Sequence, residues 1–109
     1  MRGYFLFRTG VAVNQALKST NPRIIDYAVN GRTDFLDVYL PAKCHFFVGD
    51  TAGLASIPGI FRRPVIWLNY LPLELVHTWS SKQLFIPKKL WSTNGCRFLT
   101  FREILNSDI

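Results

Sequence analysis

The chain has 109 residues, of which 49% are hydrophobic and 15% aromatic, and its net charge is +6. This length suits one compact domain, and the composition excludes a disordered chain. The charge favours anionic partners, namely nucleic acid, nucleotide phosphates or an acidic membrane face, although a solvated basic surface explains it about equally well. Basic residues are adjacent only at Arg62-Arg63 and Lys88-Lys89, which is far weaker than a nucleic-acid-binding tail.

Cysteine spacing and hydropathy exclude further classes. Cys44 and Cys96 lack the neighbouring ligands of a zinc site, and without a secretory signature they do not predict a disulfide. The N-terminal apolar run is too short for a signal peptide, and no stretch approaches the roughly 18 apolar residues of a spanning helix. These observations predict a cytoplasmic, metal-free protein.

Four short apolar runs predict the strands. They are residues 4–7, 24–25 (with Tyr27), 46–48 and 65–68. Aromatic and β-branched residues dominate these runs, and the lack of alternation is typical of parallel strands covered on both faces. Trp67, Trp79 and Trp91 are interpreted as packing residues.

Helical segments are expected between and after these strands. Asp34, with Asp37 three residues on, resembles a capping box at the start of a helix over 34–40, which Pro41 should end or kink. A second helix is expected over 54–61, with Pro58 in its first turn or at a kink. Thr100 and Glu103 predict the start of a last helix.

The order of these elements predicts an α/β fold with a parallel sheet. Four short strands and an unfinished last helix also suggest that residues 1–109 form one incomplete domain of something larger.

Residues 49–53 read Gly-Asp-Thr-Ala-Gly and follow a predicted strand, where open parallel sheets bind ligands. Glycines let a ligand approach the backbone, and free amides at a helix start favour phosphate. Asp50 is expected to cap the turn or to accept from a ligand hydroxyl, and Thr51 to donate or cap. On motif strength alone, a structural turn is favoured over a ligand loop.

Other polar residues have competing interpretations. Arg8 follows the first strand and can direct its guanidinium at a phosphate, although an exposed arginine at a strand end is commoner. Arg62 and Arg63 lie near the opposite edge and are expected to face solvent. Residues 69–73 follow the next strand at the ligand edge, and their apolar side chains can flank a flat ring. His77 is more often structural than a general base in such a setting.

Six segments in fixed order resemble one protein family. They are RIIDYA (23–28), RTDFLDVYL (32–40), CHFFVGDTAGLASIPGIFRRPV (44–65), HTW (77–79), LFIPKKLW (84–91) and RFLTFREIL (97–105). Together they resemble glycosyltransferases of bacterial surface-polysaccharide gene clusters. Members look like the GT-B type, in which two Rossmann-like halves face each other and the C-terminal half holds the nucleotide-sugar donor. The chain resembles that half.

The resemblance implies a role for each candidate residue. The loop of residues 49–54 would hold the donor diphosphate through backbone amides and Thr51, and Arg8 would help to neutralise it, without a metal or other cofactor. Residues near the base or sugar would be Asn69, Tyr70, Pro72, Leu73, His77 and Thr78. The members of the phosphate loop are Gly49, Asp50, Thr51, Ala52, Gly53 and Leu54.

A catalytic residue is not assigned, because the resemblance places any base in an N-terminal acceptor domain that the 109 residues do not include. That domain would bind a glycan or lipid-linked acceptor at the inner face of the membrane, with peripheral membrane contact, and residues 1–109 alone should be inactive. Two positions depart from the family pattern: Pro41 follows Leu40, and Ala52 stands where relatives have serine.

Two alternatives remain open. The first is a truncated gene remnant without catalytic function. The second is a small basic module that binds nucleic acid, which the scattered basic residues and the placement of aromatics inside apolar runs disfavour.

Overall fold

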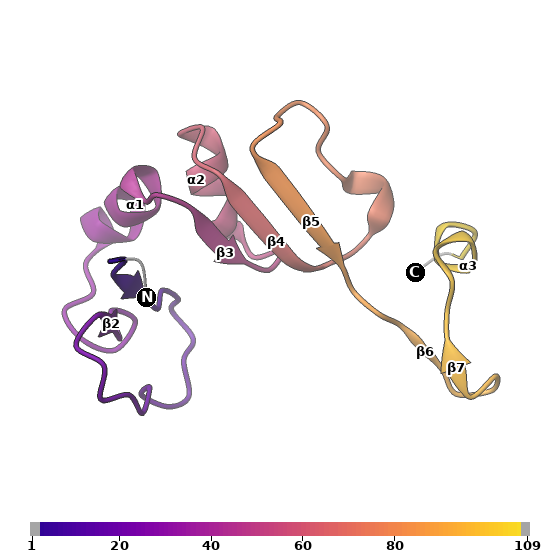
Figure 1. Ribbon diagram of the computed structural model, residues 1–109, viewed down its shortest axis with the longest axis horizontal. Helices are drawn as coiled ribbons and strands as arrows, with labels where there is room; N and C mark the ends of the chain where they lie inside the picture. The colour runs from indigo at the N-terminus through magenta and orange to yellow at the C-terminus, as the bar shows by residue number, and fades with distance from the viewer. Residues whose placement is uncertain (1–2, 108–109) are drawn as a thin grey trace. The chain divides into compact units, whose positions relative to one another are not determined.

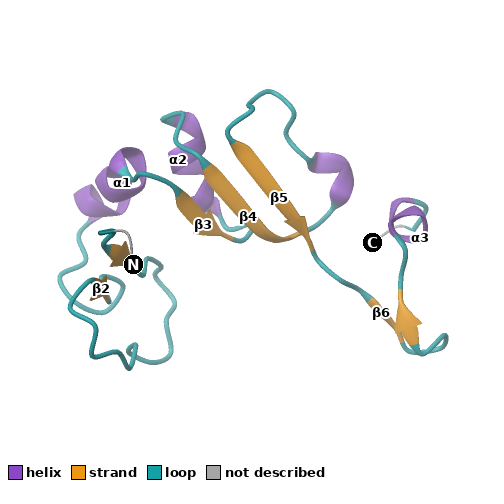
Figure 2. Cartoon of the chain, in the orientation of Figure 1, coloured by secondary structure: helices purple, strands orange, loops and turns teal. Residues whose placement is uncertain are grey.

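The computed structural model describes residues 3–107 and divides into two compact units, Met1–Leu40 and Pro41–Ile109 (Figure 1). Each unit is described by itself. The fold is mixed α/β with small parallel sheets, as the sequence predicts. The elements are coloured by type in Figure 2.

The first unit contains two short parallel strands, β1 (Leu6–Phe7) and β2 (Ile24–Ile25). The Leu6 N–H donates to the Arg23 carbonyl at 2.8 Å, and the Arg8 N–H donates to the Ile25 carbonyl at 2.9 Å. Both predicted strands are present, and the first is shorter than expected. Tyr27, just after β2, is buried, as its apolar context indicated.

The helix α1 (Asp34–Lys43) begins differently from the prediction. Its cap is Thr33, whose Oγ1 accepts from the Leu36 N–H at 3.1 Å. Asp37 does not close a capping box, because its carboxylate lies 2.7 Å from Arg32 Nη2 and 2.9 Å from Tyr27 Oη. A threonine directly before the helix supplies the same acceptor that Asp34 was expected to supply.

Pro41 lies inside α1 and does not end it, so of the two predicted effects, a stop or a kink, the stop was wrong. Proline removes one N–H donor, but the helix continues for only two more residues. Pro41 is fully buried, and this burial offsets part of the lost hydrogen bond.

The second unit is built on a three-stranded parallel sheet of β3 (Phe47–Gly49), β4 (Val65–Tyr70) and β5 (Gln83–Pro87), in that order. Phe47 pairs with Val65 and Gly49 with Trp67, while Val65 pairs with Gln83. The first two strands match predicted runs, but β5 was not predicted.

The core of this unit lies on one face of the sheet. Buried residues Val65, Trp67 and Tyr70 of β4 pack with Ala55. The Trp67 and Phe85 rings stack at 6.2 Å, and Trp67 Nε1 donates to Gln83 Oε1 at 2.9 Å. Trp67 is therefore a packing residue, as predicted, with its one polar atom paired.

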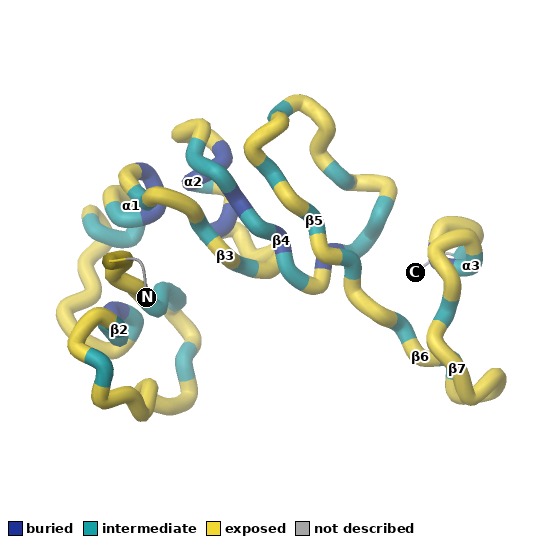
Figure 3. Tube along the Cα trace, in the orientation of Figure 1, coloured by how far each residue is buried: buried dark blue, intermediate teal, exposed yellow. Residues whose placement is uncertain are grey.

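Among the described residues, the opposite face of the sheet is exposed on its two outer strands, contrary to the expectation of cover on both faces (Figure 3). Val48, Leu84 and Ile86 are 48%, 57% and 46% exposed. The reason is topological. The connection from β3 to β4 packs Ala55 against the face that carries Trp67, and the connection from β4 to β5 packs Val76 against the same face. Alternate residues of β3 and β5 are thus left in solvent, whereas Ile66 and Leu68 of the central strand are half-buried.

The expected helix over 54–61 forms as two pieces, a 3₁₀ turn η1 (Gly53–Ala55) and a short helix α2 (Ser56–Ile60). Pro58 is the third residue of α2, so it occupies the first turn, one of the two predicted positions. A second 3₁₀ turn, η2 (Leu73–Leu75), follows β4.

The C-terminal segment forms a hairpin of β6 (Trp91–Ser92) and β7 (Arg97–Phe98), followed by α3 (Phe101–Leu105). The capping box of Thr100 and Glu103 is present, as predicted. Within residues 3–107, every helix is too short or too polar to cross a bilayer.

Candidate functional site

The carboxyl ends of β3, β4 and β5 meet at one edge of the sheet, because all three strands are parallel (Figure 1). Open parallel sheets bind ligands at this edge. The segments that leave it are the 49–54 loop after β3, residues 71–73 after β4, and Lys88 after β5. We call this the carboxyl edge.

The 49–54 loop is organised by Asp50. Its Oδ1 accepts from the Ala52 N–H at 3.1 Å, so Asp50 caps the turn, the first of its two predicted roles. The Ala55 N–H donates to the Ala52 carbonyl at 3.0 Å and opens η1. Within residues 3–107, the amides of Thr51, Gly53 and Leu54 have no acceptor. These three N–H groups are the donors that the loop can offer to an anion.

The two glycines of this loop differ in what the fold requires of them. A Cβ on Gly49 would lie 2.7 Å from Phe47 Cε1, so a side chain there conflicts with the packing of β3. A Cβ on Gly53 would meet no atom within 4 Å, and Gly53 has no positive φ. Gly49 is therefore a structural glycine, whereas the fold does not require glycine at position 53.

The segment after Leu68 belongs partly to the sheet and partly to the edge. β4 extends through Asn69, which is exposed and has a φ of 52° where the register with β5 shifts. Tyr70 is buried in the core, and its Oη donates to the Leu75 carbonyl at 2.6 Å. Burial also raises the pKa of the Tyr70 phenol. Pro72 and Leu73 follow at the carboxyl edge and are half-buried.

His77 and Thr78 lie in the segment between η2 and β5, and both are exposed. The His77 ring lies 6.0 Å from Trp67, 6.2 Å from Phe85 and 6.4 Å from Tyr70, so it borders the aromatic cluster of the core. Thr78 belongs to the segment that returns to the amino end of β5, opposite the carboxyl edge (Figure 1). The packing favours the structural interpretation of His77.

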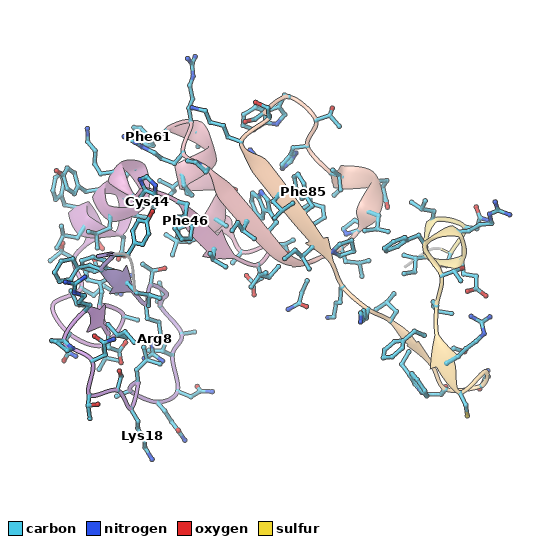
Figure 4. All side chains as sticks on the ribbon, viewed as in Figure 1. Arg8, Lys18, Cys44, Phe46, Phe61 and Phe85 are labelled. Carbon is cyan, nitrogen blue, oxygen red and sulfur yellow. The ribbon has the colours of Figure 1, made fainter. Side chains whose placement is uncertain are left out.

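Arg8 lies in the first unit, where its guanidinium has protein partners (Figure 4). Nε and Nη2 donate to the two carboxylate oxygens of Asp26 at 2.7 and 2.9 Å, and Nη2 also donates to the Gln15 carbonyl at 2.8 Å. Asp26 additionally accepts from the Leu17 N–H at 2.8 Å. The charge of Arg8 is thus compensated within its own unit, and the pair fastens the long connection between β1 and β2.

The two adjacent arginines differ from each other. Arg62 is exposed, as expected, but Arg63 is half-buried and its Nε donates to the Ala42 carbonyl at 3.0 Å. The expectation that both face solvent was wrong for Arg63, because it binds the end of α1. Burial raises the pKa of the nearby Cys44 thiol, against the opposing charge of Arg63, and this disfavours a reactive thiolate.

Residues 3–107 contain no group of three or more His, Cys, Asp and Glu side chains arranged to hold a metal ion.

Lys88 is a residue of the carboxyl edge that the sequence marks only as part of a basic pair and not as a site residue. Its N–H donates to the Tyr70 carbonyl at 3.2 Å, so its backbone is fastened beside the end of β4. Its neighbour Lys89 is held elsewhere, with Nζ 5.7 Å from the centroid of the Phe98 ring. The apolar run Leu84-Phe85-Ile86 is the sequence signal that would have located β5 and thus Lys88.

Comparison of the chain with family models, curated proteins and solved structures gives no match. The function must therefore be argued from the residues and their placement.

Proposed function

We propose that the chain is the donor-binding portion of a glycosyltransferase, which transfers a sugar from a nucleotide-sugar to a surface-glycan acceptor. In this proposal the sheet β3–β5 is part of a Rossmann-like C-terminal half. The nucleotide diphosphate binds at the carboxyl edge, against the 49–54 loop. The acceptor and any catalytic base come from a separate N-terminal domain at the membrane face.

The observation that carries the proposal is the exposed 49–54 loop with its three unpaired amides. Amide N–H groups without an internal acceptor, in a loop after a parallel strand, suit the oxygens of a phosphate. The Asp50 carboxylate accepts from the loop's own Ala52 amide, so it fixes the turn, and its negative charge adds to the need for a cation beside the phosphate.

Gly53 supports the same interpretation. Its position has open space and an ordinary backbone conformation, so packing does not account for a glycine there. A diphosphate lying against the Gly53 amide does account for it, because a Cβ would hold the ligand away from the backbone.

The test is isothermal titration of the 109-residue chain with the diphosphates of uridine, guanosine, cytidine, adenosine and thymidine. We expect at least one to bind, and ¹⁵N NMR should show the largest shifts at the amides of Thr51, Gly53 and Leu54. Gly53→Val should weaken that binding about tenfold, which corresponds to roughly 1.4 kcal/mol.

The matched control is Ser81→Val, because Ser81 is exposed at the opposite edge of the sheet. Both variants must retain the circular dichroism spectrum of the wild type. The proposal fails if no nucleoside diphosphate binds, or if Gly53→Val and Ser81→Val bind equally well. If no nucleotide binds but single-stranded RNA does, and if that RNA binding weakens steeply with added salt, the nucleic-acid alternative is favoured.

A further inference from the structure

The proposed donor site needs a cation, because backbone amides alone leave most of the charge of a diphosphate uncompensated. Arg8 was expected to supply it, but its guanidinium is paired with Asp26. We propose that Lys88 is the cation that contacts the phosphate groups. This inference rests on the proposed function and names a further residue of the same site.

The hydrogen-bond ladder places Lys88 at the carboxyl edge. Pro87 pairs with Tyr70, and the Lys88 N–H then donates to the Tyr70 carbonyl. The backbone of Lys88 is therefore an ordered continuation of β5, and its side chain begins at a fixed point beside the end of β4.

The edge is stepped, and the 49–54 loop lies at the lower level. β3 ends at Gly49, which pairs with Trp67, while β4 and β5 continue to the level of Tyr70 and Pro87. Neighbouring strands lie about 4.8 Å apart, so the ends of β3 and β5 are separated laterally by about 10 Å. A nucleoside diphosphate on the loop amides would fill this step from the β3 side, and the four-carbon stem of a lysine can extend into it from the β5 side.

Each of the three strands carries a polar residue at or just after its carboxyl end. Thr51 follows β3, Asn69 lies near the end of β4, and Lys88 follows β5. All three residues are exposed, and within residues 3–107 none of their side chains has a hydrogen-bonding or ionic partner. A hydroxyl, an amide and an ammonium group in this order suit an anion with several oxygens.

Lys89 is a matched control provided by the chain itself. It has the same side chain one residue further on, but its ammonium group lies over the Phe98 ring. Removing Lys88 or Lys89 changes the net charge equally, so a difference between the two variants reports position and not overall charge.

The experiment titrates inorganic pyrophosphate and the five nucleoside diphosphates into the wild-type chain and three variants, Lys88→Ala, Lys88→Arg and Lys89→Ala. Lys88→Ala should lower the affinity for pyrophosphate and for nucleoside diphosphates about tenfold. Lys89→Ala should lower these affinities less than threefold, and Lys88→Arg should retain most of the affinity. Because the lost contact is ionic, the effect of Lys88→Ala should shrink between 50 and 500 mM salt, concentrations that span Debye lengths of roughly 14 to 4 Å.

Thermal unfolding should show that Lys88→Ala and Lys88→Arg keep the wild-type stability, since the Lys88 side chain is exposed and its backbone bond to Tyr70 is retained. Lys89→Ala should lower the melting temperature slightly, because it removes the contact with the Phe98 ring. If a nucleoside diphosphate binds and shifts the 49–54 amides, but Lys88→Ala and Lys89→Ala weaken it equally, the role of Lys88 is refuted while the donor site stands. If no diphosphate and no pyrophosphate binds the wild-type chain, the proposed function itself fails.

Discussion

Replacing Gly49 and Gly53 separately by alanine should change the stability of the chain in opposite directions. The two glycines lie four residues apart in one loop, and each substitution adds the same methyl group. At Gly49 the new Cβ would lie 2.7 Å from Phe47 Cε1 and 3.6 Å from Ala55 Cβ. At Gly53 it would meet nothing within 4 Å.

The magnitudes follow from these distances. Carbon atoms pack best at about 3.5–4.0 Å, so the Gly49 methyl must displace the Phe47 ring or β3 by several tenths of an ångström. Overpacking of this kind costs about 1–3 kcal/mol, and the better strand propensity of alanine returns about 0.5–1 kcal/mol. We expect Gly49→Ala to destabilise the chain by about 1–2 kcal/mol, and Gly53→Ala to stabilise it by about 0.4–1 kcal/mol.

Urea unfolding followed by the fluorescence of buried Trp67 measures both changes, with thermal unfolding as a check. One kcal/mol corresponds to roughly 4–8 °C in a domain of this size. A Gly49→Ala variant as stable as the wild type would show that the Phe47 ring moves aside without cost. A Gly53→Ala variant destabilised by more than about 1 kcal/mol would show that the fold requires this glycine, and the argument from Gly53 to a ligand would be lost.

Three further outcomes are expected. Arg8→Ala should destabilise the chain by about 1–3 kcal/mol in urea unfolding, because it leaves the Asp26 carboxylate half-satisfied, and an effect below about 0.5 kcal/mol would contradict this structural role. Tyr70→Phe removes the bond to the Leu75 carbonyl and should cost about 0.5–1.5 kcal/mol in the same assay, whereas an unchanged denaturation midpoint would show that the bond contributes nothing. Hydrogen bonds from Arg97 and Thr100 hold the pKa of Glu103 well below its ordinary 4.5. The contribution of this carboxylate to folding stability is therefore fully present above pH 4.5 and declines as the pH falls below 4.5. Carboxyl ¹³C NMR should show the Glu103 pKa returning toward 4.5 in Arg97→Ala, and a pKa unmoved by that substitution would contradict the assigned cause.

The elements that the sequence located correctly are those with a strong local signal. Continuous apolar runs identified β1 to β4, and the Thr100 and Glu103 pair identified the cap of α3. In each case a few neighbouring residues contain the whole signal, so tertiary contacts were not needed to find it.

β5 (Gln-Leu-Phe-Ile-Pro) was missed although it contains a short apolar run, because that run is only three residues long and is followed directly by proline. Gln83 Oε1 accepts a hydrogen bond from Trp67 Nε1 on the neighbouring strand, and the sequence alone does not reveal this contact. The exposed face of the sheet was missed for a related reason. An all-apolar run predicts burial on both sides, whereas exposure depends on which face the connecting segments cross, and here both cross the face of Trp67.

The candidate site was predicted in part. The sequence located the 49–54 loop and the capping role of Asp50, since both follow from local turn chemistry. It did not reveal that Arg8 is paired with Asp26, which lies 18 residues away, nor that Tyr70 points its hydroxyl at Leu75. Such partners depend on how distant segments meet, and a residue type alone does not specify them.

The position of the positive charge is what connects the fold to the proposed function. A basic chain with net charge +6 offers many cations, but a phosphate site needs one that is ordered in position and uncommitted in charge. Arg8 is ordered, but its guanidinium forms an ion pair with Asp26, and the Lys89 ammonium lies over the Phe98 ring. Lys88 meets both conditions, because the strand ladder orders its backbone while its ammonium group remains exposed. A site at the carboxyl edge is therefore expected to depend on the strand that the sequence did not predict.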